Sequence, residues 1–249
     1  MLKLTHIFVG YGGGDVLKGV DLEVEKGSLT CIVGPNGAGK STVLRVISGL
    51  LKPSRGTITF QGQPIGGMSA PNILKLGIAQ IPQEHSLFPD MTVRENMELG
   101  GQLLRERSRI ERRLRQIEEK FPIIKERAKE QARNLSGGQQ RQVEIARALM
   151  LDPTLVLVDE PSMSLDPKTL AQVFEAIMQM HSAGTTVLLV EQNVRAGLSI
   201  ATHGVVMEGG NVRMRGTAQN VLKDPEMSRL FFGGTLSRSQ ASDTLTRER

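Results

Sequence analysis

The chain has 249 residues, of which 39% are hydrophobic and 23% charged, a composition that is ordinary for a globular protein and argues against disorder. All of its formal net charge of +5 falls in residues 105–133, and the remainder holds 20 side chains of each sign, which excludes a uniformly basic coat for nucleic acid. No apolar run approaches the ~18 residues of a membrane span and no secretory signal is expected, so a role at a membrane requires another chain to supply the span.

Strands with a single helix among them are expected in the first third of the chain. Alternating or continuous apolar patterns predict strands over residues 2–11, 20–34, 56–65 and 77–83. A glycine-rich turn and a helical pattern over residues 42–51 follow the second of these, which gives a strand, loop and helix unit. Cys31 lies in an apolar run and is expected to be buried; as the only cysteine it excludes an internal disulfide, which fits a reducing cytoplasm.

The middle of the sequence changes in character. Residues 91–150 are long, charged and rich in helix-favouring residues, which indicates a helical insertion. Beyond Pro153, apolar strands over residues 154–161 and 185–193 alternate with helical patterns, and a β pair is expected around Glu208–Gly210. Strands that alternate with helices predict an α/β fold with a largely parallel sheet. The polar tail over residues 235–249 is predicted to be mobile.

The sequence GPNGAGKST, Gly34–Thr42, matches the pattern of a phosphate-binding loop and lies between a predicted strand and a predicted helix. Its glycines allow backbone amides to converge on phosphate oxygens at the start of a helix, where the helix dipole assists. Lys40 can reach the β and γ phosphates, and the hydroxyl of Ser41 can hold Mg²⁺. The alternative is a plain glycine-rich turn, which the complete pattern in this context disfavours.

The buried strand LVLVDE, Leu155–Glu160, delivers two carboxylates at its carboxyl end, the edge where open α/β sheets bind ligands. We expect Asp159 to hold the magnesium shell and Glu160 to polarise the attacking water. A simple acidic turn is the alternative.

A second phosphate-receiving helix start is predicted in LSGGQQRQVEIARAL, Leu135–Leu149, where Ser136, Gly137 and Gly138 precede a helical pattern. Read alone, these residues could be only a helix cap. Because the chain has one complete magnesium site, the second start is expected to serve a nucleotide that another subunit holds.

These motifs resemble those of the ATP-binding cassette family, and the resemblance covers about residues 2–232. The order is specific: GPNGAGKST, Gln83 in IPQEH, LSGGQQ, LVLVDEP, SLD at Ser164–Asp166 and VEQN at Glu191–Asn193. The resemblance implies a RecA-like P-loop NTPase core of the α/β class with an antiparallel β subdomain and a helical insertion. The implied catalytic core comprises residues 1–87 and 153–232, the helical subdomain residues 88–152, and a mobile tail residues 233–249.

The resemblance further implies an ATPase that uses ATP and Mg²⁺. Two cassettes of this family sandwich two ATP molecules, and each LSGGQ loop touches the γ phosphate held by the opposite phosphate loop. Carried over, the catalytic residues are Glu160, Gln83 and Gln192, the metal ligands are Ser41, Gln83 and Asp159, and Ser164–Asp166 line the subunit junction. The implied nucleotide contacts are Tyr11, Gly34, Pro35, Asn36, Gly37, Ala38, Gly39, Lys40, Ser41, Thr42, Ser136, Gly137, Gly138 and Gln139.

Two positions need separate comment. Tyr11, the only tyrosine, stands where the family has an aromatic side chain that stacks on adenine; a core tyrosine is the alternative. Gln192 stands where most of the family has a histidine that contacts the γ phosphate. Glutamine can donate a hydrogen bond but cannot carry a proton charge near neutral pH, which puts independent turnover of this site in question and favours a heterodimer.

Three short motifs make the chain similar to the smaller ATPase subunit of branched-chain amino-acid importers. They are VEQN, an FP-containing loop after PQ, and ISGLL. This resemblance implies a second cassette, related or identical, two transmembrane permease subunits, and indirectly a periplasmic or extracellular solute-binding protein, with no nucleic acid. The chain would lie peripherally at the cytoplasmic face of the inner membrane. The loop Gln83–Met97, with Leu87, Phe88, Pro89 and Met91, is the expected permease socket; internal packing of these side chains is the alternative.

Other functions remain open at this point. They are an importer ATPase for urea or amides, an exporter, and a soluble cassette ATPase that acts on nucleic acid or ribosomes. The basic segment 105–133 is expected to be a solvated helix face with i,i+4 pairs, with contact to anionic lipid headgroups or to a membrane partner as the alternative.

Overall fold

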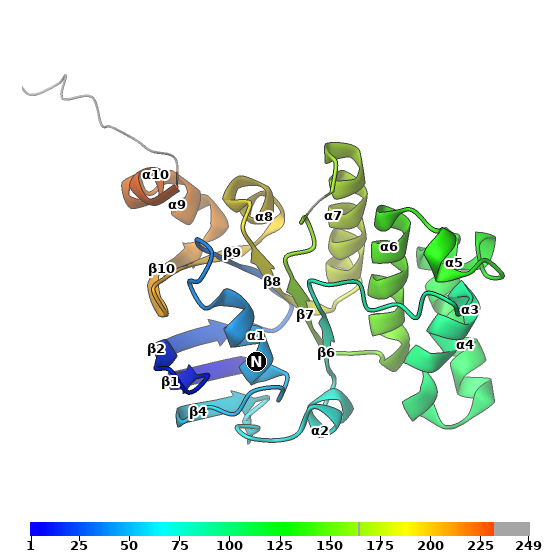
Figure 1. The fold of residues 1–249 in the computed structure, drawn as a ribbon, viewed down its shortest axis with the longest axis horizontal. Helices are drawn as coiled ribbons and strands as arrows, with labels where there is room; N and C mark the ends of the chain where they lie inside the picture. Colours follow the sequence, from blue (N-terminus) through cyan, green and yellow to red (C-terminus); the bar gives the residue numbers. More distant parts are fainter. Residues whose placement is uncertain (164, 232–249) are drawn as a thin grey trace, which may run out of the picture.

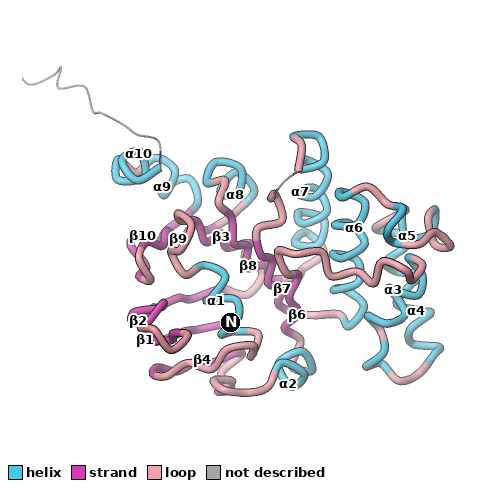
Figure 2. Tube along the Cα trace, viewed as in Figure 1, coloured by secondary structure: helices cyan, strands magenta, loops and turns pink. Residues whose placement is uncertain are grey.

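The structure is a computed structural model that describes residues 1–163 and 165–231. Ser164, part of the expected subunit junction, and the tail over residues 233–249, expected to be mobile, lie outside the described residues. Two sheets form the middle of the molecule and helices cover them (Figures 1 and 2). Within the described ranges, no helix is both long enough and apolar enough to cross a membrane.

The larger sheet has six strands in the order β10-β9-β3-β8-β7-β6. Its strands are β3 Leu29–Val33, β6 Ile78–Ile81, β7 Leu155–Asp159, β8 Thr186–Glu191, β9 His203–Glu208 and β10 Asn211–Thr217. All neighbouring pairs are parallel except β9 and β10, which form an antiparallel edge. This arrangement confirms the predicted α/β class with a largely parallel sheet, and places the ends of β3, β7 and β8 along one edge.

The smaller sheet is antiparallel, in the order β2-β1-β4-β5, and agrees with the antiparallel β subdomain that the family resemblance implies. Its strands are β1 Leu2–Gly10, β2 Asp15–Val24, β4 Arg55–Phe60 and β5 Gln63–Pro64. Their alternating apolar side chains point into a core that they share with one face of the larger sheet.

The helix α1, Lys40–Ile47, lies between the two sheets, and its buried apolar residues belong to that shared core. The central strands are apolar on both faces: Leu155 and Leu157 of β7 join the α1 side, whereas Val156 and Val158 join the opposite side. This double burial explains why β3, β7 and β8 read as continuous apolar runs in the sequence. It also fixes α1, and with it the phosphate loop, against the sheet.

The remaining helices lie around the larger sheet. They are α2 Ala70–Lys75, α3 Val93–Gly100, α4 Arg107–Lys120, α5 Pro122–Glu126, α6 Gly137–Ala148, α7 Pro167–Ser182, α8 Val194–Ile200, α9 Ala218–Lys223 and α10 Pro225–Phe231. Short 3₁₀ turns are η1 Gln102–Leu104, η2 Ala132–Asn134 and η3 Leu149–Leu151. Helices α3 to α6 gather at one side of the molecule, beyond α7, whereas α9 and α10 lie at the other (Figure 1).

The insertion expected over residues 91–150 is indeed helical, and the β pair expected around Glu208–Gly210 is the β9–β10 turn. Cys31 is fully buried, as expected for a small apolar side chain. The division into a core of residues 1–87 and 153–232 and a helical subdomain of residues 88–152 stays a prediction.

Candidate active site

The phosphate-binding loop connects β3 to α1, as the sequence predicted. Gly37 and Gly39 have φ angles of 79° and 96°, in the left-handed region that favours glycine. A Cβ atom at Gly39 would also lie 2.7 Å from Cδ2 of Leu17, so the loop has no room for a side chain there. The resulting turn starts α1 at Lys40 and directs the free amides of its first turn to the surface at the sheet edge.

Lys40 is held at the centre of the site, although its side chain is only 4% exposed. Its ammonium donates hydrogen bonds to the carbonyl oxygens of Gly34 at 3.0 Å and Pro35 at 3.3 Å. The same Nζ atom lies 3.2 Å from Oε1 of Glu160. A buried ammonium needs such partners, and together they fix the position from which it could reach a phosphate group.

Ser41 and Asp159 meet although 118 residues separate them, because the start of α1 faces the end of β7. The Ser41 hydroxyl donates to Oδ1 of Asp159 at 2.9 Å. Burial raises the pKa of Asp159, although the hydrogen bond from Ser41 and the nearby cations oppose that shift. A buried carboxylate gains from a positive charge beside it, and a hydroxyl with a carboxylate is a donor set of the kind that Mg²⁺ takes.

Glu160 follows Asp159 with a φ of 41°, a backbone conformation that side-chain-bearing residues rarely adopt and that costs of order 1–3 kcal/mol. Its amide donates to the carbonyl of Val190 on β8 at 2.9 Å, which holds the turn against the neighbouring strand. This backbone turn directs two successive carboxylates to the same edge of the sheet. The sequence does not reveal this backbone strain, which lies at a residue that was predicted to be catalytic.

Gln83 lies beside Glu160, with its amide nitrogen 3.4 Å from Oε2 of that carboxylate. The same nitrogen lies 2.8 Å from the sulfur of Met163, a residue that was not predicted to belong to the site. Gln83 and Gln192 both line a cavity of about 350 Å³ at the phosphate loop. The cavity is also lined by Asn36, Gly37, Ala38, Gly39, Lys40, Ser41, Thr42, Glu160 and Met163, which brings together most of the predicted site.

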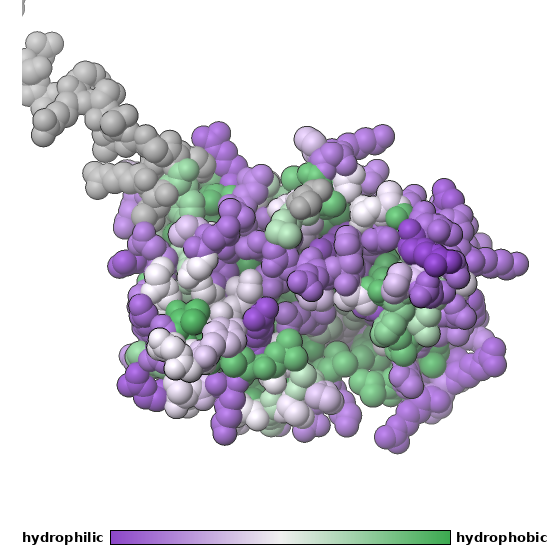
Figure 3. Space-filling model, in the orientation of Figure 1, coloured by the Kyte–Doolittle hydropathy of each residue, from purple (hydrophilic) through white to green (hydrophobic). Residues whose placement is uncertain are grey.

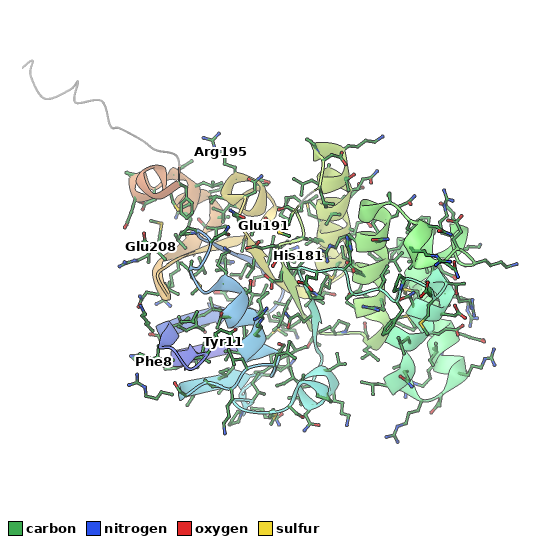
Figure 4. The ribbon with its side chains drawn as sticks, viewed as in Figure 1. Phe8, Tyr11, His181, Glu191, Arg195 and Glu208 are labelled. Atoms are coloured by element: carbon green, nitrogen blue, oxygen red, sulfur yellow. The ribbon has the colours of Figure 1, made fainter. Side chains whose placement is uncertain are left out.

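Glu191, the last residue of β8, carries Gln192 into the cavity and is itself fully buried. Its carboxylate accepts from the amide of Ser162 at 3.2 Å and from the Ser162 hydroxyl at 2.6 Å. Burial raises the pKa of Glu191, against the effect of these hydrogen bonds. Glu191 thereby joins the segment that bears Gln192 to the segment after Glu160. Figure 4 shows it near the middle of the molecule.

Tyr11 does not line this cavity. Its side chain is 56% exposed, which excludes the alternative of a core tyrosine. The hydroxyl accepts a hydrogen bond from Nη1 of Arg45, on α1, at 3.2 Å. Figure 4 shows Tyr11 close to α1, so an aromatic face stands beside the helix that begins at the phosphate loop. The contact between Arg45 and Tyr11 was not predicted, because no pattern in the sequence indicates which residue an exposed arginine of α1 meets.

The second predicted helix start is the beginning of α6. Ser136 caps this helix: its hydroxyl accepts from the amide of Gln139 at 3.4 Å, and the Gln139 side chain accepts from the Ser136 amide at 3.0 Å. Gly138 packs against Thr169 of α7, where a Cβ atom would overlap the threonine methyl group. Neither Ser136, Gly137, Gly138 nor Gln139 lines the cavity at the phosphate loop. The structure therefore does not bring this helix start to the chain's own phosphate loop.

Two buried charged residues of α6, which pair with each other, hydrogen-bond to the backbone of the Gln83 loop. Arg141 is 4% exposed and donates to the carbonyl of Pro82 at 2.8 Å and to that of Gln83 at 2.7 Å. Glu144, which is 2% exposed, lies 2.8 Å from Arg141 and accepts from the amide of Ser86 at 2.5 Å. Both charged residues were missed in the sequence, where they look like ordinary residues of a charged helix.

The chain was compared with protein families, curated proteins and solved structures. A family model described as ABC transporter matches residues 17–163. The high-affinity branched-chain amino acid transport ATP-binding protein BraG of Pseudomonas aeruginosa is 36% identical over 94% of this chain and 100% of its own. The lipopolysaccharide export system ATP-binding protein LptB of Acidithiobacillus ferridurans is 31% identical over 94% of this chain and 97% of its own.

Solved structures give the same result. An ATP-binding cassette of an ABC transporter in its ADP conformation is 30% identical with a TM-score of 0.83, and the alignment covers 94% of this chain and 99% of that one. A dimeric bacterial ABC transporter cassette is 27% identical with a TM-score of 0.76, covering 88% and 99%. With the phosphate loop, the paired carboxylates and the capped α6 in place, the chain belongs to the ABC transporter family and is an ATPase of the cassette type.

Proposed function

We propose that the chain is the ATP-hydrolysing subunit of an importer for amino acids. Branched-chain amino acids are the best-supported solutes. The observation that carries the proposal is the similarity to BraG, which extends over the whole of that protein. A branched-chain transport ATP-binding protein named LivF, of Archaeoglobus fulgidus, is 32% identical over 94% of this chain. Proteins named for arginine transport and for lipopolysaccharide export are also similar to this chain. An experiment must therefore identify the solute.

The site geometry supports a direct route to hydrolysis. Lys40 neutralises the phosphates of ATP, which the amides at the start of α1 also bind. The oxygens of Ser41 and Asp159 would hold Mg²⁺, which would supply charge neutralisation on the phosphate groups. Glu160 accepts the proton of the attacking water, and Gln83, whose amide lies beside that carboxylate, helps to orient the water. Gln192 donates a hydrogen bond to the γ phosphate through its amide.

The Ser136 end of α6 serves the nucleotide of a second cassette, either another copy of this chain or a related one. Support comes from the absence of Ser136 to Gln139 from the lining of the chain's own cavity, and from the dimeric structure of a similar cassette. ATP then favours the closed pair, because its contacts are complete only when both surfaces meet.

The assembly is proposed to contain two permease subunits, one of which docks on this chain in a cleft of about 300 Å³ between α2 and α6, at the cytoplasmic face of the membrane. Apolar side chains line most of it, including Leu50, Leu74, Ala148 and Leu151, and Ser86 and Arg147 add polar groups. Figure 3 shows apolar residues gathered between α2 and the helices α4 and α6. We call this cleft the docking groove. In the neighbouring loop, Phe88 is 50% exposed and Leu87 is half-buried against the core.

Replacing Phe88 with Asp tests the docking. A charge in place of an exposed aromatic group should abolish solute uptake by the assembled transporter and leave ATP binding by the isolated chain unchanged. Uptake and nucleotide affinity are measured in parallel, with Met178→Asp, an exposed residue of α7 that lines neither the docking groove nor the nucleotide cavity, as the matched control. Uptake at the normal rate in the Phe88→Asp protein would refute the role of this loop.

The solute is tested by deleting the chain in its host and following uptake of labelled leucine, arginine and urea. Loss of leucine uptake alone supports the proposal. Loss of urea uptake with normal leucine uptake would replace it with the amide or urea alternative. A second independent observation is the ligand specificity of any solute-binding protein encoded beside the chain, since that protein meets the solute and this one does not.

A further inference from the structure

The segment that holds the chain's net charge also lines a cavity. This cavity of about 270 Å³ lies where α4, η1 and η3 meet, and we call it the arginine cavity. Its lining residues are Leu104, Arg109, Arg112, Arg113, Gln116, Met150 and Asp152. Positions 109, 112, 113 and 116 are spaced so that they share one face of α4, which explains why three guanidinium groups meet there.

Arg113 forms a fixed wall of the arginine cavity. Its Nε and Nη2 atoms donate to the carbonyl of Leu149 at 3.0 and 2.9 Å, and Nη2 also lies 2.7 Å from Oδ1 of Asp152. The Arg113 side chain is 21% exposed, whereas Asp152 is 81% exposed. The only carboxylate that lines the cavity is therefore already engaged, and a ligand would meet a surface that is ordered in advance.

Arg109 and Arg112 are exposed, and unlike Arg107 and Arg113 on the same helix they form no ion pair with a carboxylate of the described residues. A solvated face with i,i+4 pairs was expected here, and Arg107 does form such a pair with Glu111 at 3.4 Å. Across residues 1–163 and 165–231, no carboxylate lies within ion-pair distance of Arg109 or Arg112. The cavity therefore keeps two positive charges that no acidic side chain offsets. Guanidinium groups present planar, paired donors that match the oxygens of a phosphate group.

The arginine cavity lies next to the docking groove, because the same two chain segments build both. Gly100, Ala148 and Leu151 line the groove, and Leu104 and Met150, which are close to them in sequence, line the cavity. Leu103, beside Leu104, is 47% exposed. Protein surfaces that bind anionic membranes typically combine arginines with exposed apolar side chains.

We propose that the arginine cavity binds the phosphate group of an anionic phospholipid headgroup, so that α4 contacts the membrane surface beside the permease subunits. Arg109 and Arg112 supply the charge, Arg113 holds the cavity open, and Leu103 and Leu104 lie against the glycerol and upper acyl region. This goes beyond the proposed function and relies on it only for the side of the molecule that faces the membrane. The cavity does not include any residue of the nucleotide site, and α4 is remote from α1 in Figure 1.

The test measures sedimentation of the full-length chain with vesicles of mixed phosphatidylglycerol and phosphatidylcholine, and with vesicles of phosphatidylcholine alone. Each arginine near an anionic surface contributes about a five-fold gain in partitioning, so Arg109→Gln/Arg112→Gln should bind the mixed vesicles about 30-fold more weakly than the wild type. The matched control is Arg107→Gln/Arg115→Gln, which removes the same charge from the same helix without touching the cavity lining. ATP hydrolysis by both variants reports that they fold.

A loss confined to the Arg109→Gln/Arg112→Gln protein, with no binding to phosphatidylcholine vesicles, supports the proposal. Equal losses in both variants would overturn it, because the attraction would then belong to overall charge. Binding of inorganic phosphate in solution, lost in the Arg109→Gln/Arg112→Gln protein while vesicle binding stays normal, would overturn the lipid as the source. Failure of the Phe88→Asp test leaves these outcomes unaffected, so the two proposals fail separately.

Discussion

At the scale of single residues, the site depends on groups that are distant in sequence and touch in space. The side chains of Ser41 and Asp159 are 2.9 Å apart, and Lys40 lies 3.2 Å from Glu160. Each of these contacts stabilises the folded site, because a buried charge without a partner costs several kcal/mol. The strained backbone at Glu160 belongs to the same arrangement, since it turns this carboxylate into the cavity that the phosphate loop lines.

Replacing Glu160 with Gln should leave ATP binding intact and lower turnover by about two to four orders of magnitude, because the amide cannot accept the proton of the attacking water. Single-turnover hydrolysis and gel filtration with ATP measure the two effects, and the variant should accumulate as a closed pair of cassettes. Glu175→Gln, an exposed carboxylate on α7, is the control. Turnover at the wild-type rate in the Glu160→Gln protein would contradict the assigned role.

Tyr11 permits a sharper test than a single substitution. Loss of the ring in Tyr11→Ala should weaken ATP binding by about 5- to 150-fold, the range expected for one stacked base. Tyr11→Phe keeps the ring and removes only the hydroxyl that accepts from Arg45, so its affinity should stay close to that of the wild type. Nucleotide titration distinguishes the two, and equal losses in both proteins would assign the effect to the Arg45 hydrogen bond.

At the scale of elements, α6 is the most connected helix of the site. Its first turn is capped by Ser136, its middle holds the backbone of Gln83 through Arg141, and Glu144 and Arg147 reach the loop that lines the docking groove. Arg141 donates to the carbonyls of Pro82 and Gln83, and Glu144 accepts from the Ser86 amide, so we expect a movement of this loop to displace α6 as well. Through these contacts α6 connects the Ser136 end of the helix, the backbone of Gln83 and the docking groove.

Replacing Arg141 with Lys should lower turnover several-fold while ATP affinity stays unchanged. Lysine keeps the charge beside Glu144 but cannot present paired donors to the two carbonyls, so Gln83 loses its fixed position. Thermal unfolding of the variant separates a positioning effect from global destabilisation, and Arg94→Lys, on the exposed face of α3, is the control. Normal turnover in a stably folded Arg141→Lys protein would show that Arg141 only stabilises the structure.

At the scale of the whole molecule, two sheets and α1 form a body that holds the nucleotide site, and a group of helices beside it carries the uneven charge (Figure 1). The docking groove lies between the two parts and the arginine cavity lies next to it. The phosphate loop, the groove and the arginine cavity are therefore separate surfaces of one chain. This separation allows the nucleotide site and the proposed permease and lipid contacts to be tested one at a time.

The sequence by itself determined the fold class, the phosphate loop and the family, because these depend on local patterns: glycines where the loop requires positive φ, and apolar runs where strands are buried on both faces. Only the tertiary structure decided which groups meet. The pairing of Arg141 with the Gln83 carbonyls, the hydrogen bond from Arg45 to Tyr11, and the contact of Glu191 with Ser162 all join separate segments. Their reason is geometric: these segments come together only after the sheets and helices have packed, as when β7 and β8 become neighbours and bring Ser162 to Glu191.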